Sequence, residues 1–315
     1  MRLPLKSPTV AAWLFLAAFT IIALLVVGGA TRLTTSGLSI TEWKPISGIL
    51  PPGSDAGWAA EFANYKKIPQ FAQINPHMTV DQFKGIYWWE WAHRLIARLL
   101  GVIYLLPFVF FLLMSEVPAR VIWRSGVAIA LILFQGLVGW WMVASGLSKR
   151  AFVAPEMLMF HLGMALLLLA WTLWTALEAG EGAPRSRGAP WGWRAGAGVL
   201  LGLVYFQCLL GALVAGNQAG LVYNDWPLMN GGVVPYTDWG QGIGMVLFHD
   251  QGVVQFMHRL NAYLLLVFAI VFAIRLAIRC QDDTVKGLAI SVAVLACVQA
   301  CLGIATLWTV VNFKK

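Results

Sequence analysis

Seven stretches of this chain are apolar over enough residues to cross a lipid bilayer as helices. About 20 residues are needed to cross about 30 Å of hydrocarbon. The composition agrees with such a use, because 59% of the 315 residues are hydrophobic and only 11% are charged. The stretches lie near residues 10–30, 87–113, 123–145, 157–178, 195–216, 254–277 and 287–311. The sequence therefore predicts an all-α polytopic membrane protein, with long loops at 31–86 and 217–253.

The basic residues predict the orientation of the chain in the membrane. Ten of them lie in the segments that share a side with the N-terminus, and the 217–253 loop has none. Cytoplasmic segments carry such an excess, so we expect a cytoplasmic N-terminus and both long loops outside. The net charge of +8 is explained by these flanking residues, and no nucleic-acid partner is expected. The N-terminus has too few basic residues for an organelle transit peptide, and its apolar stretch is too long for a cleaved signal, so we expect a bacterial inner (plasma) membrane.

The chain repeats itself. The segment "GGATRLTTSGLSITEWKPISGILPP" from Gly28 aligns with "GALVAGNQAGLVYNDWPLMNGGVVP" from Gly211 at an offset of 183. The segment "WWEWAHRLIA" aligns with "VVQFMHRLNA" at an offset of 165, which pairs His93 with His258. "LFQGLVGW" and "CVQACLGI" align at 164. Such internal symmetry indicates a duplicated helical unit.

Each repeat is expected to be a four-helix bundle, and the two bundles to be pseudo-symmetric about an axis along the membrane normal. Residues 1–180 form the first repeat and residues 181–315 the second, which contains three predicted helices. The counterpart of His161 would fall near position 325. We therefore expect the last helix of the second bundle to be missing from this chain.

Three histidines lie four to six residues inside the same ends of their predicted spans: His93, His161 and His258. A lone membrane histidine commonly makes an interhelical hydrogen bond. Three at one depth favour haem iron, which needs one or two axial imidazoles between facing helices. Zinc would need a larger ligand cluster, which the sequence does not offer. The pattern predicts one haem site per repeat: His93 with His161, and His258 with a partner outside the chain.

The repeats differ at the residue one turn before the first histidine, which is Glu90 in one and Gln255 in the other. A carboxylate beside one haem and an amide beside the other suggests chemistry at the first site and electron handling at the second. Glu90 could stabilise positive charge or accept a proton, or it could simply pair with Arg94, four residues on. Arg94 and Arg259 are candidates for contacts with haem propionates.

These residues resemble the haem A synthase family, of the type found in alphaproteobacteria and mitochondria. The similarity lies in "GGATRLTTSGLSITEWKPISGILPP", "EWAHRLIARLLG", "AGLVYNDWPLMNGGVVP" and "FMHRLNAY", and it covers essentially the whole chain. Members oxidise the C8 methyl of haem O to a formyl group through an alcohol, with water as the inferred oxygen source. Members of the other type have a cysteine pair in an outer loop, which this chain lacks.

The resemblance implies roles for individual residues. It implies that haem O lies between His93 and His161, that Glu90 is catalytic, and that His258 binds a resident haem b. A haem O synthase and oxidase assembly factors are possible partners. Two other readings stay open on the residues alone: a bis-histidine cytochrome b that only carries electrons, and a haem carrier or chaperone that releases its haem unmodified.

Overall fold

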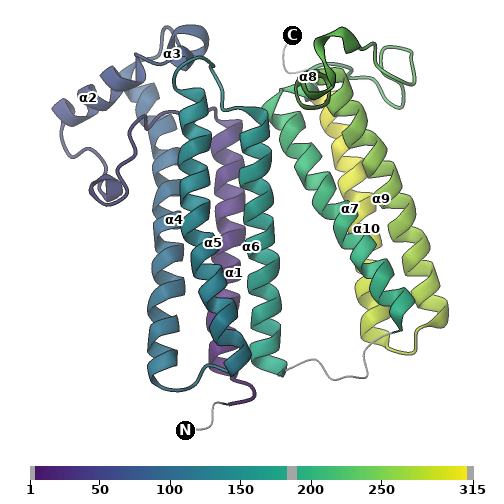
Figure 1. Cartoon of the computed structure of the whole chain (residues 1–315). Coiled ribbons are helices and arrows are strands. Elements are labelled where there is room, and N and C mark those ends of the chain that lie inside the picture. The colour runs from purple at the N-terminus through teal and green to yellow at the C-terminus, as the bar shows by residue number, and fades with distance from the viewer. Residues whose placement is uncertain (1–3, 183–189, 311–315) are drawn as a thin grey trace. The chain divides into compact units, whose positions relative to one another are not determined.

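The computed structural model describes residues 4–182 and 190–310, and within them the regular elements are helical. Seven helices are long and apolar enough to cross a membrane, as the sequence predicts. They are α1 (Pro8–Leu33), α4 (Val80–Leu113), α5 (Ala119–Gly146), α6 (Pro155–Glu181), α7 (Trp191–Gly216), α9 (Gln251–Arg279) and α10 (Asp283–Val310) (Figure 1). The prediction of an all-α protein with seven spans is confirmed.

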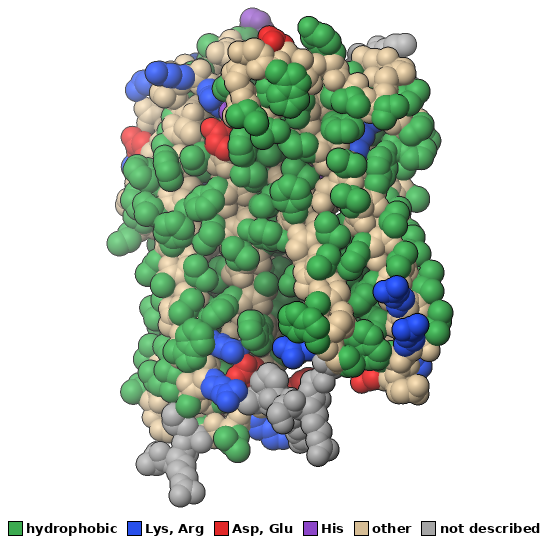
Figure 2. Space-filling model, turned by 45° about the vertical axis from the view of Figure 1, so that its right-hand side comes forward, with side chains coloured by type: hydrophobic (Ala, Val, Ile, Leu, Met, Phe, Trp, Pro, Cys, Tyr) green, Lys and Arg blue, Asp and Glu red, His purple; other side chains and the backbone are tan. Residues whose placement is uncertain are grey.

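The surface of the helices is apolar. Figure 2 shows hydrophobic side chains along the lengths of the helices, with most charged side chains near the helix ends. Large side chains such as Phe19 and Leu133 are 68% and 72% exposed. Water would oppose the exposure of so much apolar surface, whereas lipid tails solvate it. The chain is accordingly a multi-pass membrane protein.

Helix α4 begins seven residues earlier than the sequence predicts, at Val80 instead of residue 87. The reason is a capping box. Thr79 Oγ1 accepts the backbone N–H of Gln82 at 3.3 Å, and Gln82 Oε1 accepts the N–H of Thr79 at 2.9 Å. The helix has 34 residues and is about 51 Å long, so it exceeds the hydrocarbon thickness by about 20 Å. Apolar length alone does not detect the polar turns that project beyond the lipid.

The chain divides into two compact units, Met1–Arg187 and Gly188–Lys315. The first contains α1, α4, α5 and α6, and the second contains α7, α9 and α10. In each unit we call the end where α1 or α7 finishes, and α4 or α9 begins, the long-loop end. Both long loops predicted from the sequence lie at these ends.

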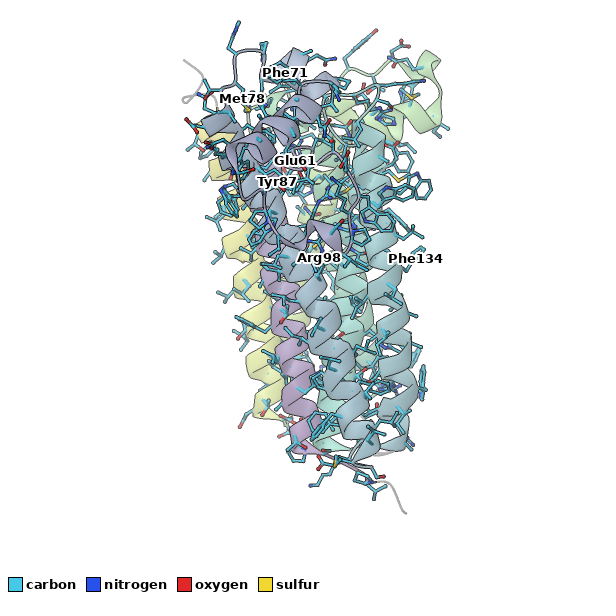
Figure 3. The ribbon with its side chains drawn as sticks, turned by 90° about the vertical axis from the view of Figure 1, so that its left-hand side faces the viewer. Glu61, Phe71, Met78, Tyr87, Arg98 and Phe134 are labelled. Atoms are coloured by element: carbon cyan, nitrogen blue, oxygen red, sulfur yellow. The ribbon has the colours of Figure 1, made fainter. Side chains whose placement is uncertain are left out.

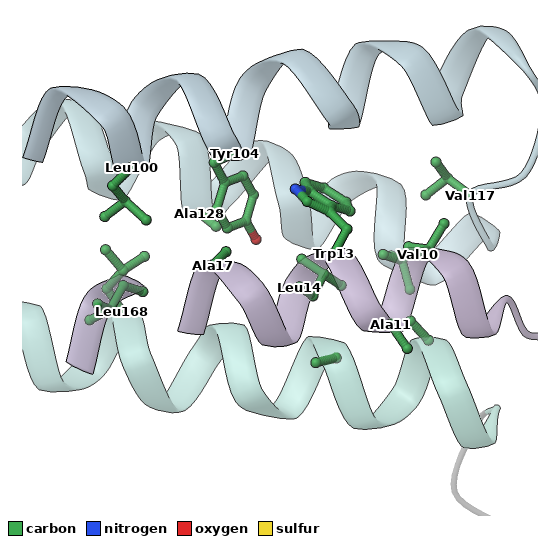
Figure 4. Packing of buried hydrophobic residues seen from close by; sticks show 14 residues of the cluster. Val10, Ala11, Trp13, Leu14, Ala17, Leu100, Tyr104, Val117, Ala128 and Leu168 are labelled. Atoms are coloured by element: carbon green, nitrogen blue, oxygen red, sulfur yellow. The ribbon is translucent and has the colours of Figure 1, made fainter. Parts of the chain in front are cut away.

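The core of the first unit is built around α1, which packs against both α4 and α6. Helix α5 packs closely on α6 and only loosely on α4, so α4 and α6 occupy opposite corners of the bundle. Figure 4 shows Trp13 and Leu14 of α1 in the same layer of buried side chains as Tyr104 of α4. The indole of Trp13 also donates to the carbonyl of Ile103 at 2.7 Å. These contacts fix α4 beside α1.

The long loop of the first unit is more structured than the sequence analysis indicates. It contains a short 3₁₀ helix, η1 (Ser47–Ile49), and two α-helices, α2 (Asp55–Tyr65) and α3 (Pro69–Ile74). Their buried face packs on the first turns of α4 through an aromatic cluster. The buried members are Leu38, Phe62, Tyr65, Ile68, Phe83 and Tyr87. The loop is thus a folded cap on the long-loop end.

In the second unit, α9 packs against α7 on one side and α10 on the other. Its long loop holds η2 (Ala219–Leu221), η3 (Trp239–Gln241) and α8 (Ile243–His249). The side chain of Asp250 caps α9 by accepting the N–H of Val253 at 2.8 Å. The loop therefore ends directly in the helix that carries His258.

Candidate functional site

His93 lies on α4, and its imidazole is pressed against α1. A Cβ atom placed on Gly28 of α1 would lie 3.1 Å from Cε1 of His93. His161 on α6 repeats this arrangement with α5, where a Cβ on Gly139 would lie 3.1 Å from Cε1 of His161. A side chain at either glycine would press on the ring, so both imidazoles lie close against the backbone of a neighbouring helix.

The two imidazoles come from opposite corners of the bundle and are close enough to interact electrostatically. The Nδ1 atoms of His93 and His161 are buried, and no hydrogen-bond partner for either lies within the described residues. Gln135 Nε2 donates to the carbonyl of His161 at 2.8 Å, which ties α5 to α6 at this level. This is the helix-to-helix role that amides commonly have in membranes.

Glu90 is buried, with 3% of its surface exposed, and its carboxylate accepts four hydrogen bonds. Oε1 accepts from Nε and Nη2 of Arg94 at 3.0 and 2.6 Å. Oε2 accepts from Ser39 Oγ at 2.7 Å and from the backbone N–H of Ile40 at 2.9 Å. Pairing with Arg94, which the sequence analysis left as an alternative to chemistry, is therefore present in the structure. The carboxylate also fastens the long loop to α4.

Two arginines of α4 bind carbonyl groups of the same loop. Arg94 donates to Ile40 O at 2.8 Å and Glu42 O at 3.1 Å. Arg98 donates to Pro45 O at 2.9 Å and to Lys44 O at 3.0 Å. Loop residues 39–45 are thereby held along α4 by guanidinium groups, whose fork geometry suits two acceptors at once.

The second unit repeats this clamp at equivalent positions. Arg259 Nη2 donates to Tyr223 O at 2.7 Å and Asp225 O at 3.0 Å. At the offset of 183 these two carbonyls correspond to those of Ile40 and Glu42. His258 is likewise packed against Gly211, where a Cβ would lie 3.4 Å from its Cε1. The pairs Arg94 and Arg259, and His93 and His258, thus occupy corresponding environments.

Gln255 replaces Glu90 in this second clamp, and the direction of its loop contacts is reversed. Its Nε2 donates to Ala219 O at 3.1 Å and Val222 O at 2.9 Å, whereas Glu90 accepts from the loop. Its Oε1 still accepts from Arg259, at 3.3 Å. At this position the repeats therefore differ in charge and in the direction of the hydrogen bonds between side chain and loop.

Several residues around the histidines were not identified from the sequence as site residues. Ser39 has no counterpart with a hydroxyl, since Val222 stands at the equivalent position. Gln207 Nε2 lies 3.1 Å from both ring nitrogens of His258, and its Oε1 accepts from Asn261 at 2.8 Å. The repeat offered a signal for the glycines beside the rings, because it pairs Gly28 with Gly211 and Gly139 with Gly303, and a retained glycine indicates a close approach.

These residues fit a haem better than a bare metal ion. Among the described residues, no group of three or more His, Cys, Asp or Glu side chains could hold a metal. A haem brings four ring ligands of its own and needs only axial imidazoles. In the first unit, two glycine-cradled imidazoles with unpaired Nδ1 atoms and apolar surroundings match that need.

Fold and site together define a multi-pass, all-α membrane protein in which corresponding helices of two units each hold an imidazole beside an arginine clamp. The chain belongs to the COX15-CtaA family, described as cytochrome oxidase assembly protein, whose model matches residues 11–314.

Curated relatives agree over nearly the full chain. A "Heme A synthase" of Caulobacter sp. (strain K31) is 55% identical over 307 residues, which cover 97% of this chain and 89% of the relative. The "Heme A synthase" of Caulobacter vibrioides is 52% identical over 313 residues, with the same two coverages. That of Bradyrhizobium sp. (strain ORS 278) is 46% identical over 304 residues, covering 95% and 83%.

Proposed function

We propose that this protein is a haem A synthase, an oxidoreductase that converts haem O to haem A. The full-length similarity to haem A synthases carries the assignment. The first unit supports it, because the imidazoles of His93 and His161 come from opposite corners of its bundle and His93 lies one helical turn from the buried carboxylate of Glu90. In this proposal the two units are pseudo-symmetric repeats. The first binds the substrate haem, and the second binds a resident haem.

In this proposal the substrate, haem O, lies between His93 and His161 in the first unit. The reaction oxidises its C8 methyl to a formyl group through an alcohol, with water supplying the oxygen. The imidazoles hold the iron, and the glycine contacts at Gly28 and Gly139 fix the positions of their rings. A substrate fixed in this way reacts at one methyl only, since a shift of about 1 Å is enough to cost reactivity.

Glu90 is the catalytic residue of the proposal, and its contacts favour one of the two roles open to it. Four N–H or O–H groups donate to the ionised carboxylate of Glu90. If Glu90 took up a proton, that proton would have to displace one of these donors. A fixed negative charge stabilises positive charge that develops on the methyl carbon during oxidation. We therefore assign Glu90 to electrostatic stabilisation in preference to proton abstraction.

The second unit holds the resident cofactor, haem b, through His258. When bound, this haem supplies electron transfer. Gln255 in place of Glu90 leaves the site without a carboxylate at that point, which suits a haem that is retained unmodified.

Arg94 and Arg259 act first as clamps on their loops. Arg94 divides its four hydrogen bonds equally between Glu90 and loop carbonyls, and Arg259 gives three of its four to loop carbonyls. Only the N–H groups of these arginines that have no other partner can bind haem propionates. Arg259 has such a donor, since its Nε is buried and has no partner within the described residues.

The protein is proposed to lie in the bacterial inner membrane with its N-terminus in the cytoplasm and both long-loop ends outside. The excess of basic residues on the N-terminal side supports this orientation. A haem O synthase and oxidase assembly factors are the proposed partners, since haem O is membrane-bound and haem A serves terminal oxidases.

The experiment is haem analysis after co-expression with a haem O synthase in a host that lacks haem A. Pigments extracted from the membranes are separated by chromatography and identified by mass. We expect haem A or its alcohol intermediate with the native chain and neither with Glu90→Ala. Unmodified haem O and haem b alone, from a chain shown to be folded, would overturn the proposal in favour of an electron or haem carrier.

A further inference from the structure

The first unit has an outer segment that the second unit lacks. The repeat offset falls from 183 to 165 between Pro52 and Trp88, so the first long loop holds 18 more residues than the second. Helices α2 and α3 lie in this stretch. Since only the first unit is assigned chemistry, the additional segment is a place to look for a residue that serves the reaction.

Helix α2 forms one wall of a half-open pocket over one side of α4. The pocket has a volume of about 250 Å³. It lies between the loop that the arginines clamp, α2 and α4, and its charged or phenolic members are Glu42, Lys44, Glu61, Tyr87, Arg94 and Arg98. Figure 3 shows Glu61 next to Tyr87, with Arg98 further along α4.

Two polar atoms of the pocket residues are buried without a hydrogen-bond partner within the described residues: Glu61 Oε2 and Arg98 Nη1. Burying such atoms unpaired costs about 1–3 kcal/mol each. Its lining is part polar and part apolar, and at about 30 Å³ for each molecule the pocket has room for about eight waters, which would pair both atoms. We therefore treat it as a hydrated pocket.

Arg94 connects this pocket to Glu90. It lines the pocket, and its Nε and Nη2 bind the Glu90 carboxylate at 3.0 and 2.6 Å. Glu61 is close enough to Arg94 for the two charges to interact. One guanidinium group thus lies between the carboxylate of Glu90 and the carboxylate of Glu61 in the pocket.

The chemistry requires a route for protons. Oxidation of a methyl group with one water molecule to a formyl group releases four protons and four electrons. The electrons pass to the electron acceptor of the activity, a membrane-bound carrier. The protons have to leave a site enclosed by apolar helices, and water chains with titratable side chains are the usual means.

We propose that Glu61 is the proton acceptor of this pocket, and that it passes protons released at the substrate site to the aqueous phase at the long-loop end. Water in the pocket carries each proton past Arg94 to the Glu61 carboxylate. The inference rests on the proposed function, because it assumes that the first unit oxidises haem O. Glu61 acts through the pocket water and does not touch the substrate.

The charges around Glu61 agree with this role. Burial raises the pKa of its carboxyl above the ordinary value of 4.5, and Glu42 raises it further, while Lys44 and Arg94 act in the opposite direction. Tyr87 and Arg98 face the same pocket from α4. A glutamate with a raised pKa holds a proton more readily near neutral pH and can still release it to bulk water.

The second unit lacks this arrangement. The repeat alignment assigns no counterpart to Glu61, because the offset changes across the stretch that contains it, and Gln255 stands in place of Glu90. Both carboxylates are thus found in the unit with the proposed chemistry.

The titration of Glu61 can be measured without turnover. Infrared difference spectra of the purified protein in lipid nanodiscs, recorded against pH, report the C=O stretch of protonated carboxyl groups. We expect a carboxyl band that titrates above pH 4.5 in the native protein and is absent in Glu61→Gln. Glu42→Gln is the matched control, because it removes an equal charge from the same pocket and should retain the band.

The second measurement is the rate of haem A formation against pH in membranes that contain haem O and their own electron carriers. Since only the ionised carboxylate accepts a proton, the native rate should fall on the acid side as pH drops through the pKa of Glu61. In Glu61→Gln this fall in rate on the acid side should be absent. The variant should form haem A about tenfold more slowly and show a larger solvent isotope effect. About tenfold is below the roughly 10²–10⁴-fold typical of direct acid–base residues.

The variants distinguish a relay from a structural role. Glu61→Asp should restore most of the rate and the acid limb, and the content of resident haem b should be unchanged in all variants. A native rate and pH profile in Glu61→Gln would overturn the inference while leaving the synthase intact. If the native chain forms no haem A, the proposed function fails and the inference fails with it.

Discussion

Glu90 and Gln255 stand at equivalent positions of the two units and differ in charge. Each is buried beside an arginine and each binds the loop that covers its site. Glu90 accepts from Ser39 and Ile40, while Gln255 donates to two carbonyls. The first loop therefore presents donor groups to Glu90, and the second presents carbonyl acceptors to Gln255. Exchanging the two side chains would place unmatched hydrogen-bond groups against the loop in either unit.

Glu90→Gln tests the charge at this position with almost no change in volume. The amide should keep the contacts with Ser39 and Ile40 through its oxygen but place an N–H group against Arg94. We expect haem A formation to fall by about 10²–10³-fold, as for loss of one electrostatic stabiliser, while haem O still binds. The measurement is haem A formed per bound haem O in membranes.

Gln255→Glu is the reciprocal control for that experiment. It should change the second unit without abolishing haem A formation, since the charge at Glu90 remains. Equal loss of activity in both variants would mean that the position serves packing in each unit and that its charge has no special role.

At the scale of helices, the imidazoles are positioned by close approach of a neighbouring backbone. Gly139 of α5 is partly buried, and a Cβ there would press on His161. Gly136, one turn away, has open space where its Cβ would lie, with nothing within 4 Å. The two glycines therefore provide a pair of substitutions on one helix that differ only in what they meet.

Gly139→Val should displace the His161 ring, and we expect haem O bound per protein to fall by about tenfold or more. Gly136→Val, with the same change in helix propensity, should leave it near the native value. Haem content of the purified variants is the measurement. Equal losses in both would assign the effect to α5 as a helix and not to the imidazole contact.

The capping box predicts how the first turns of α4 are held. Thr79→Ala removes the hydroxyl that accepts the Gln82 N–H, and we expect a loss of about 1 kcal/mol in the stability of these turns. Hydrogen exchange of the amides at 81–84 should become faster by about fivefold as a result. Exchange near Glu90 should not change, because α1 and the loop hold that part of the helix. Ser54→Ala, which uncaps α2, should leave 81–84 unaffected.

At the scale of the whole molecule, each unit encloses its own imidazoles. His93 and His161 contact glycines of the first unit, and His258 contacts Gly211 and Gln207 of the second. His258→Ala should therefore abolish resident haem b while haem O still binds in the first unit. His93→Ala should do the reverse. Haem b and haem O per protein, measured in both variants by pigment extraction, check this separation.

A single haem site shared by the units would give a different result. In that case either substitution would remove both haems together. Retention of haem b in His258→Ala would locate the resident haem elsewhere and would withdraw the proposed role of that histidine without affecting the family assignment.

The sequence by itself determined the membrane class, the seven spans and the internal repeat. Each of these is a local property, because a helix in lipid needs only its own hydrogen bonds and enough apolar length. The repeat also singled out His93 and His258, since equivalent residues in duplicated units can be aligned without knowing any contact. The start of α4 was wrong by seven residues because its first turns lie outside the lipid, where apolar length carries no signal.

Only the tertiary structure decided which groups meet. Glu90 binds Ile40 across 50 residues of sequence, Gly28 contacts His93, and α2 brings Glu61 over Arg94. Spacing along the chain cannot reveal such contacts, because they depend on how loops fold back and which helices become neighbours. The sequence named residues able to hold a haem, and the packing of α1, α4, α5 and α6 with their loop determined how those residues are held.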